Sequence, residues 1–144
     1  TTSIQEALYK MDLPALQKKL GEFLVQSISF HDAASESFYH GLILGLCAMM
    51  EDRYRITSNR EAGYGRFDIQ MFPLKRHLPG VLIELKAGKN CTEEQLEELA
   101  QTALQQIKDR AYETELMAQG AKTILRYGLA FSGKKVSIAA DGTP

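Results

Sequence analysis

The sequence predicts a single mixed α/β domain, in which helices pack on one central sheet. Three observations support this prediction. Apolar residues repeat at helical spacing through residues 1–50 and again after residue 92. Between these segments, short runs rich in β-branched and aromatic residues alternate apolar and polar side chains, as strands do. The length of 144 residues fits one domain with one core, so we treat 1–144 as a single unit.

Helix-start signals divide residues 1–50 into three predicted helices. Ser3 and Glu6 match a capping box, in which each side chain satisfies a main-chain amide of the other residue. Asp12 is a candidate N-cap of the second helix, and either Asp32 or Ser35 is a candidate for the third. The N-terminal part is therefore expected to be helical throughout.

The part from residue 51 onward is expected to hold the sheet and one long helix. Strands are predicted at 54–57, 66–72 and 81–86, in an antiparallel meander, with 61–65 as a turn or bulged strand. A capping box at 92–95 begins the crossover helix, whose apolar stripe extends through Leu116 to a stop at Gly120. Two further strands, 123–131 and 135–138, follow it.

Composition excludes several classes of protein. The two cysteines, Cys47 and Cys91, are too few for a disulfide framework or a zinc site, and their scarcity suits a reducing cytoplasm. Cys47 is expected to be buried as a small hydrophobe. No apolar run is long enough to span a membrane. The chain starts at Thr1 without a methionine or a signal peptide, and we expect it to be a domain excised from a longer cytoplasmic protein.

Net charge is −1, but the charge is unevenly distributed. Residues 52–90 carry eight basic and four acidic side chains, and a local basic face can attract phosphate even on a neutral protein. Scattered, solvated charge is an equally good interpretation of these numbers. Within this segment Arg60 and Arg66 are candidate phosphate contacts.

The candidate chemistry lies on two of the predicted strands. Because side chains alternate along a strand, Glu84 and Lys86 share one face and Leu85 points to the other. An adjacent antiparallel strand could place Asp68 beside Glu84, which would make an oxygen-rich site suited to Mg²⁺. A lysine two residues on could hold an attacking water or neutralise phosphate charge. The alternative is an ordinary exposed Glu/Lys pair on a half-buried strand.

The residues around this pair resemble a known family. Arg66-Phe67-Asp68 followed by Glu84-Leu85-Lys86 is similar to the signature of the PD-(D/E)XK nuclease superfamily, although Phe67 replaces its proline. From Glu36 to Ile138 the chain resembles one branch, found C-terminal to AAA-ATPase-like domains in bacterial proteins. The segments that carry the resemblance are 35–41, 60–68, 83–86, 103–107 and 127–131.

This resemblance implies a restriction-endonuclease-like core and a metal-dependent nuclease that hydrolyses phosphodiester bonds, with DNA as the expected substrate. It implies that Asp68 and Glu84 bind Mg²⁺ or Mn²⁺, that the Leu85 carbonyl adds a third oxygen, and that Lys86 positions the attacking water. The alternative is a catalytically silent module of the same fold, which binds nucleic acid or protein beside an AAA-ATPase-like domain of the same chain.

Other residues are implicated by position in the family. Glu36 matches an acidic residue that supports the metal from the first core helix, and the alternative is a glutamate favoured by the helix dipole. His40 lies one turn further and is more often a packed residue than a magnesium ligand. Gln106 matches an active-site glutamine, for which Gln105 competes. Tyr112 is expected to accompany it as a substrate contact.

Overall fold

The computed structural model describes residues 3–27, 35–61, 66–109 and 113–143. Five strands form one mixed sheet and lie side by side in chain order. Strands β3 and β4 are parallel, and every other neighbouring pair is antiparallel. The predicted meander and the C-terminal hairpin are thus confirmed. The strands are β1 (Tyr54–Glu61), β2 (Arg66–Pro73), β3 (Gly80–Ala87), β4 (Ile124–Ser132) and β5 (Lys135–Thr143).

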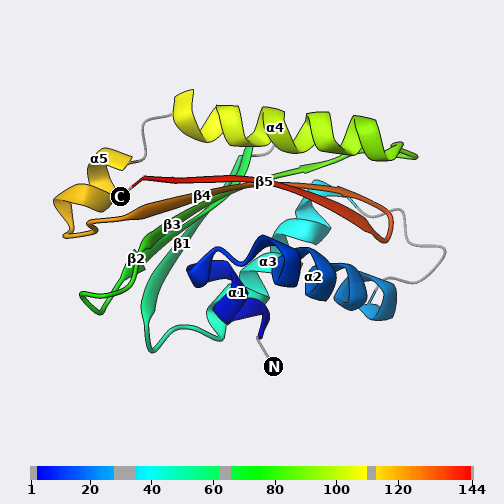
Figure 1. Cartoon of the computed structure of the whole chain (residues 1–144). Helices are drawn as coiled ribbons and strands as arrows, with labels where there is room; N and C mark the ends of the chain where they lie inside the picture. The colour runs from blue at the N-terminus through cyan, green and yellow to red at the C-terminus, as the bar shows by residue number, and fades with distance from the viewer. Residues whose placement is uncertain (1–2, 28–34, 62–65, 110–112, 144) are drawn as a thin grey trace.

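Helices cover both faces of this sheet (Figure 1). On one face lie α1 (Ile4–Lys10), α2 (Leu13–Ser27) and α3 (Glu36–Ala48). On the other lie α4 (Glu93–Asp109), which crosses from β3 to β4, and the short α5 (Glu113–Ala118). The α/β class with a flanked mixed sheet is therefore as predicted. No helix in the described ranges combines the length and the apolar character needed to cross a bilayer.

The predicted helix starts are observed as side-chain caps. The Ser3 hydroxyl accepts the Glu6 amide at 3.1 Å, and the Asp12 carboxylate accepts the Ala15 amide at 3.2 Å. Ser35 caps α3, while the competing candidate, Asp32, lies outside the described residues. At α4 the capping box is complete, because the Thr92 and Gln95 side chains each accept the other's amide, at 3.2 and 2.9 Å. Local sequence chemistry therefore fixes where these helices begin.

Some predicted elements differ in extent from the observed ones. Strands β1 and β5 extend beyond the predicted 54–57 and 135–138. The single long helix expected through Leu116 is two helices, α4 and α5, which the prediction joined because the apolar stripe continues at helical spacing on both. The predicted stop at Gly120 is confirmed. Its φ of 99° lies in the left-handed region. The Gly120 amide donates to the Met117 carbonyl, and the Ala121 amide donates to the Leu116 carbonyl. This pattern is a Schellman motif, which satisfies the last carbonyls of a helix.

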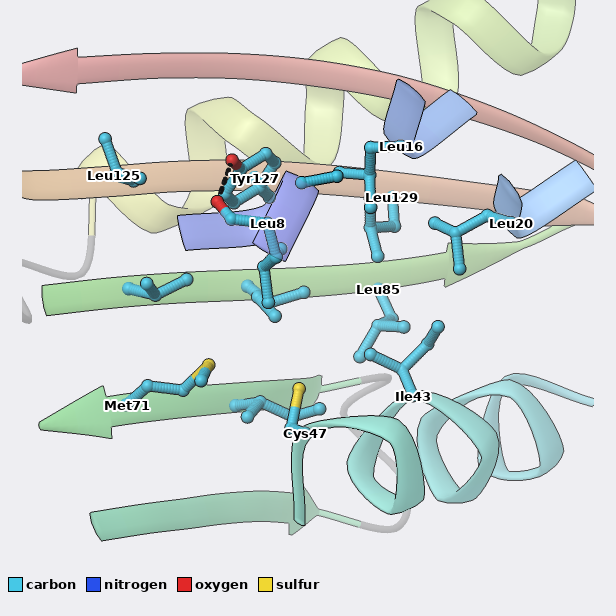
Figure 2. Packing of buried hydrophobic residues seen from close by; sticks show 14 of the residues in the cluster. Leu8, Leu16, Leu20, Ile43, Cys47, Met71, Leu85, Leu125, Tyr127 and Leu129 are labelled. Atoms are coloured by element: carbon cyan, nitrogen blue, oxygen red, sulfur yellow. Dashed lines mark hydrogen bonds between the residues drawn. The ribbon is translucent and has the colours of Figure 1, made fainter. Parts of the chain in front are cut away.

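Two apolar clusters fill the space on either side of the sheet. Figure 2 shows the larger one, where Ile43 and Cys47 of α3 lie against the strands and the Tyr127 hydroxyl donates to the Leu8 carbonyl. Cys47 is 2% exposed, as predicted, and burial raises the pKa of its thiol to about 12. This cluster holds α1, α2 and α3 against the sheet.

The second face brings helix and sheet unusually close at Gly128. A Cβ atom placed there would lie 2.2 Å from the Ala100 carbonyl oxygen and 2.6 Å from the Leu104 amide nitrogen. Both atoms belong to the main chain of α4, so neither can move as a flexible side chain would. Gly128 is also the register partner of Glu84 on β3. The absence of a side chain therefore sets the depth at which α4 lies beside Glu84.

Ion pairs attach the end of α4 and the start of α5 to the last two strands. Asp141 of β5 pairs with Lys108 at 2.7 Å and with the buried Arg126 at 2.9 Å, while Arg126 also binds Glu113. Partial burial alone would raise the pKa of Asp141, but the hydrogen bonds and charges of Lys108 and Arg126 outweigh it and hold that pKa below its ordinary value. The two helices are thus linked to the sheet through one carboxylate.

Replacing Asp141 by asparagine should remove a pH-dependent part of the stability. A depressed pKa in the folded state stabilises the protein above about pH 4, and this contribution is lost as pH falls through the folded-state value. We expect Asp141→Asn to lower the free energy of unfolding by about 1 kcal/mol at pH 7, and the difference to shrink as the pH falls below about 4. Urea denaturation across this range measures it. Asp52→Asn, which removes an exposed ion pair with Arg53, is the control. A loss of stability in Asp141→Asn that did not change with pH would contradict a lowered pKa of Asp141.

Candidate active site

The two predicted carboxylates face each other across strands β2 and β3. Asp68 is the direct register partner of Glu84 in this antiparallel pair. Side chains at such positions point to the same face, with Cβ atoms about 5 Å apart. Asp68 is 2% exposed and Glu84 is fully buried. The structure therefore places the two acidic residues at adjacent positions on one face of the sheet, as strand alternation predicted.

This face is the one on which α4 and α5 pack. Leu82 and Phe72, each an even number of residues from Glu84 or Asp68 along its strand, belong to the apolar cluster under those helices. Ile83, by contrast, belongs to the cluster under α1, α2 and α3. Lys86 shares the face of Glu84 by alternation and is half-buried. All three residues of the predicted catalytic core therefore lie on one side of the sheet.

The sheet opens immediately beyond the carboxylate pair. The pairing of β2 with β3 ends at Asp68 and Glu84, whereas β1 and β2 stay paired as far as Arg66. The Gly80 and Gly88 amides donate to carbonyls on the β4 side, so alternation turns the main-chain groups of Leu85 toward β2. The Leu85 carbonyl is thereby directed into the gap between β2 and β3, beside Asp68.

Glu36 reaches the same gap from the opposite face. Its carboxylate accepts the amide of Ala87, the residue after Lys86, at 3.2 Å. That amide also points toward β2, beyond the last paired residues of β2 and β3. Glu36 thus lies at the end of β3, beside the opening, and it does not project from the face that carries Asp68 and Glu84. His40 follows one turn along α3 and is buried.

Burial separates the two candidate glutamines. Gln106 is half-buried and lies on the flank of α4 that carries Leu99 and Ala103, next to Gly88 and Gly128 of the sheet. Its Oε1 atom is shielded from solvent and accepts no hydrogen bond from a described residue. Gln105 is exposed. Of the two, Gln106 has the position from which a side chain can face the β3 carboxylate.

Three predicted substrate contacts are not placed by the structure. Tyr112 lies outside the described residues. Arg60 and Arg66 are described only as main-chain positions of β1 and β2, next to the end where the sheet opens, and their side chains lie outside the described part. Their roles remain predictions.

Sequence reasoning missed one polar residue of this face. Gln70 is 6% exposed and lies on β2 between Asp68 and Phe72, on the same side as both. The signal was present in the sequence, because a polar residue two positions from a predicted metal ligand shares its face. A buried amide therefore extends the polar surface beside the carboxylates.

The donor atoms assembled here are hard oxygens. The carboxylate atoms Asp68 Oδ1 and Glu84 Oε2 are both shielded from solvent. Such oxygens, together with a main-chain carbonyl, are the ligands that Mg²⁺ and Mn²⁺ prefer, so the residues fit a divalent ion of this kind. The described residues do not, however, form a group of three or more His, Cys, Asp or Glu that could hold a metal. Among the described residues, a divalent ion at this place would therefore have Asp68 and Glu84 as acidic ligands, with the Leu85 carbonyl and water to complete its coordination.

Comparison with protein families agrees with this geometry. A family model described as the PD-(D/E)XK nuclease superfamily matches residues 34–141. The chain belongs to this superfamily. The matched region includes Asp68, Glu84 and Lys86 and extends from the start of α3 into β5. A comparison with curated proteins finds no match.

Proposed function

We propose that this domain is a metal-dependent nuclease that hydrolyses phosphodiester bonds of DNA. The observation that carries the proposal is the direct opposition of two buried carboxylates, Asp68 and Glu84, with Lys86 on the same face. Two buried carboxylates side by side repel each other unless a cation or a proton lies with them. A structural role alone would be served better by apolar residues at these positions.

Each residue can be given a task in this reaction. Asp68, Glu84 and the Leu85 carbonyl would hold Mg²⁺ or Mn²⁺. When bound, such an ion supplies Lewis-acid charge and makes a coordinated water easier to deprotonate. Lys86 would orient the attacking water and offset the charge that develops on the phosphate oxygens. Charge on a phosphodiester transition state lies on oxygen, which is the atom that an ammonium group binds best.

Two further residues would position this group. Gln106, whose Oε1 is buried without a described partner, would accept a hydrogen bond from a water or from the substrate. Glu36 would hold the end of β3, and with it Lys86, through the Ala87 amide. Its carboxylate has a second oxygen, which could accept a hydrogen bond from water in the gap. We further propose that an AAA-ATPase-like domain of the full-length protein delivers the substrate.

One observation favours the alternative of a catalytically silent binding module. No third acidic or histidine side chain stands close enough to the pair, among the described residues, to complete a protein-only metal site. In that case Asp68 and Glu84 would bind no divalent ion at millimolar concentration. Measurement of metal binding therefore separates the two functions.

Isothermal titration with Mn²⁺ should show binding to the wild-type domain and loss of it in Asp68→Asn and Glu84→Gln. We expect affinity to fall at least about tenfold in each variant, because removing one of two acidic ligands leaves a weak site. In parallel, wild-type protein at high concentration should cleave DNA with Mg²⁺ or Mn²⁺ but not with EDTA.

Glu51→Gln, an exposed acidic residue outside the pair, is the matched control and should bind Mn²⁺ as the wild type does. Equal Mn²⁺ affinity in all four proteins would exclude the carboxylate pair as the metal site. Absence of Mn²⁺ binding by the wild type, together with no cleavage of any DNA by the full-length protein, would favour the silent module.

A further inference from the structure

Three cations surround a hollow at the end of the sheet remote from Asp68. The hollow measures about 410 Å³ and is lined by Lys75 and Arg76, from the β2–β3 connection, and by Gln119, Gly120 and Lys122, from the turn after α5. In Figure 1 this connection and α5 lie at the same end of the molecule. We call this hollow, with its three cations Lys75, Arg76 and Lys122, the basic hollow. Segments more than 40 residues apart in the chain thus contribute to one concave surface.

The charge of the basic hollow is not neutralised by the described part of the chain. All three side chains are exposed, and none forms an ion pair with a described residue. The residues that line it include no carboxylate. On a chain of net charge −1 and isoelectric point near 6.3, three such cations around one hollow are a local concentration of positive charge. A surface of this kind attracts an anion of several charges, because each cation is otherwise compensated only by salt.

A polar path joins the basic hollow to the carboxylate pair. Arg55 of β1 lies at the near end, with its guanidinium 4.2 Å from the centre of the Phe72 ring and hydrogen-bonded to Gln119. Thr57 and Asn59 follow on the same face of β1, and Asn59 is the register partner of Asp68. Strand alternation therefore lines the whole distance with one cationic and two neutral polar side chains.

The length of this path fits a nucleic-acid strand. Pro73 borders the hollow and is five residues from Asp68 on β2, which corresponds to about 17 Å along a strand. Each strand of B-DNA carries one phosphate per roughly 3.4 Å of helix axis, so about five phosphates span the distance.

We propose that the basic hollow binds the DNA backbone about five nucleotides from the bond that is cleaved. That the bound DNA strand runs from the basic hollow toward Asp68 and Glu84 rests on the proposed function, because that function places the reacting phosphate at these two residues. Contacts of this kind are made to phosphate and carry no sequence information, so the basic hollow sets register and affinity but not sequence preference.

The test is the salt dependence of DNA binding. A fluorescein-labelled duplex of 20 base pairs is titrated in EDTA, at several KCl concentrations, with wild-type protein and with Lys75→Gln/Arg76→Gln/Lys122→Gln. A matched variant, Lys18→Gln/Lys19→Gln/Lys134→Gln, removes the same charge from α2 and the β4–β5 turn. We expect the hollow variant to lower the slope of log K against log [KCl] by roughly 2 to 3, at about 0.9 for each phosphate that the protein no longer neutralises, and to bind at least about tenfold more weakly.

The matched variant should keep the wild-type slope. Equal slopes for the two triple variants, or a wild-type affinity that does not depend on salt, would overturn the proposal. Thermal unfolding of both variants shows that the comparison is between folded proteins. Because EDTA prevents metal-dependent cleavage, the outcome is separate from the proposed function. If the hollow variant loses DNA affinity, the basic hollow is supported even where the wild type cleaves no DNA. If the two triple variants have equal salt slopes, the basic hollow is refuted even where the wild type cleaves DNA.

Discussion

Lys86→Ala is expected to slow DNA cleavage roughly 10²–10³-fold while it leaves Mn²⁺ affinity within about a factor of three. Lys86 lies on the face of Glu84 but is only half-buried, whereas the Asp68 and Glu84 side chains are buried, so under the proposed function its ammonium would lie closer to a bound phosphodiester. Under the proposed function, removal of this charge would take away stabilisation of developing oxyanion charge, an interaction that is stronger in the transition state than in the ground state. The loss should therefore appear in kcat more than in KM. Single-turnover cleavage of a labelled duplex and Mn²⁺ titration measure the two quantities.

Lys89→Ala provides the matched control. Lys89 is exposed in the connection between β3 and α4, only three residues away, so its replacement removes the same charge from the same region. We expect its cleavage rate to stay within about threefold of wild type, since an exposed charge in high dielectric contributes little. If Lys86→Ala and Lys89→Ala slowed cleavage equally, the effect would be general electrostatic attraction of DNA. If Lys86→Ala cleaved as fast as wild type, with EDTA still inhibiting, Lys86 would have no part in the chemistry.

Gly128→Ala is expected to lower the free energy of unfolding by at least about 3 kcal/mol. The added methyl group would meet the Ala100 oxygen and the Leu104 nitrogen at distances far inside van der Waals contact. To relieve this clash, α4 has to move away from β4. Because α4 also packs on β3 and β5, the movement would disturb its packing on all three strands. For a domain of this size such a loss corresponds to roughly 10 °C in Tm. Chemical and thermal denaturation measure it.

Gly45→Ala separates this clash from the general effect of replacing glycine. Gly45 lies within α3, is exposed, and has no atom within 4 Å of an added Cβ. There we expect stabilisation by about 0.5–1 kcal/mol, because alanine loses less backbone freedom on folding and favours the helix. Equal stability of Gly128→Ala and wild type would show that α4 does not lie as close to β4 as the structure indicates. Any Gly128→Ala protein that folds should also cleave more slowly, since α4 carries Gln106.

Local patterns in the sequence predicted most of the fold. Capping residues such as Ser3 and Thr92 act on amides three residues away, so the starts of α1 and α4 could be recognised without knowledge of the tertiary structure. Strand alternation assigned Glu84 and Lys86 to one face. The division of the crossover segment into α4 and α5 was missed because periodicity reports which residues face the core, and Leu116 does face it.

What the sequence could not supply were contacts between distant segments. The bond from the Ala87 amide to Glu36 joins residues 51 apart and depends on where β2 and β3 separate. The choice between Gln105 and Gln106 depends on the rotation of α4 about its axis, which the close approach at Gly128 helps to fix. The burial of Arg126 depends on Asp141 and Glu113 arriving from two other elements. The catalytic and metal-binding roles of the candidate site residues remain predictions.

The chain-order arrangement of the strands has a consequence for how the domain folds. β1, β2 and β3 join their neighbours through short connections, so the pairing of Asp68 with Glu84 closes a loop of few residues. β4 instead follows β3 after the 36 residues from Gly88 to Thr123. Closing this long connection costs conformational entropy before the parallel pairing of β3 and β4 can offset it. The carboxylate pair therefore belongs to the part with low contact order and Gln106 to the part with high contact order. We therefore expect the meander to form the folding nucleus, so that destabilising substitutions in α4 and β4 mainly raise the unfolding rate and change the folding rate little.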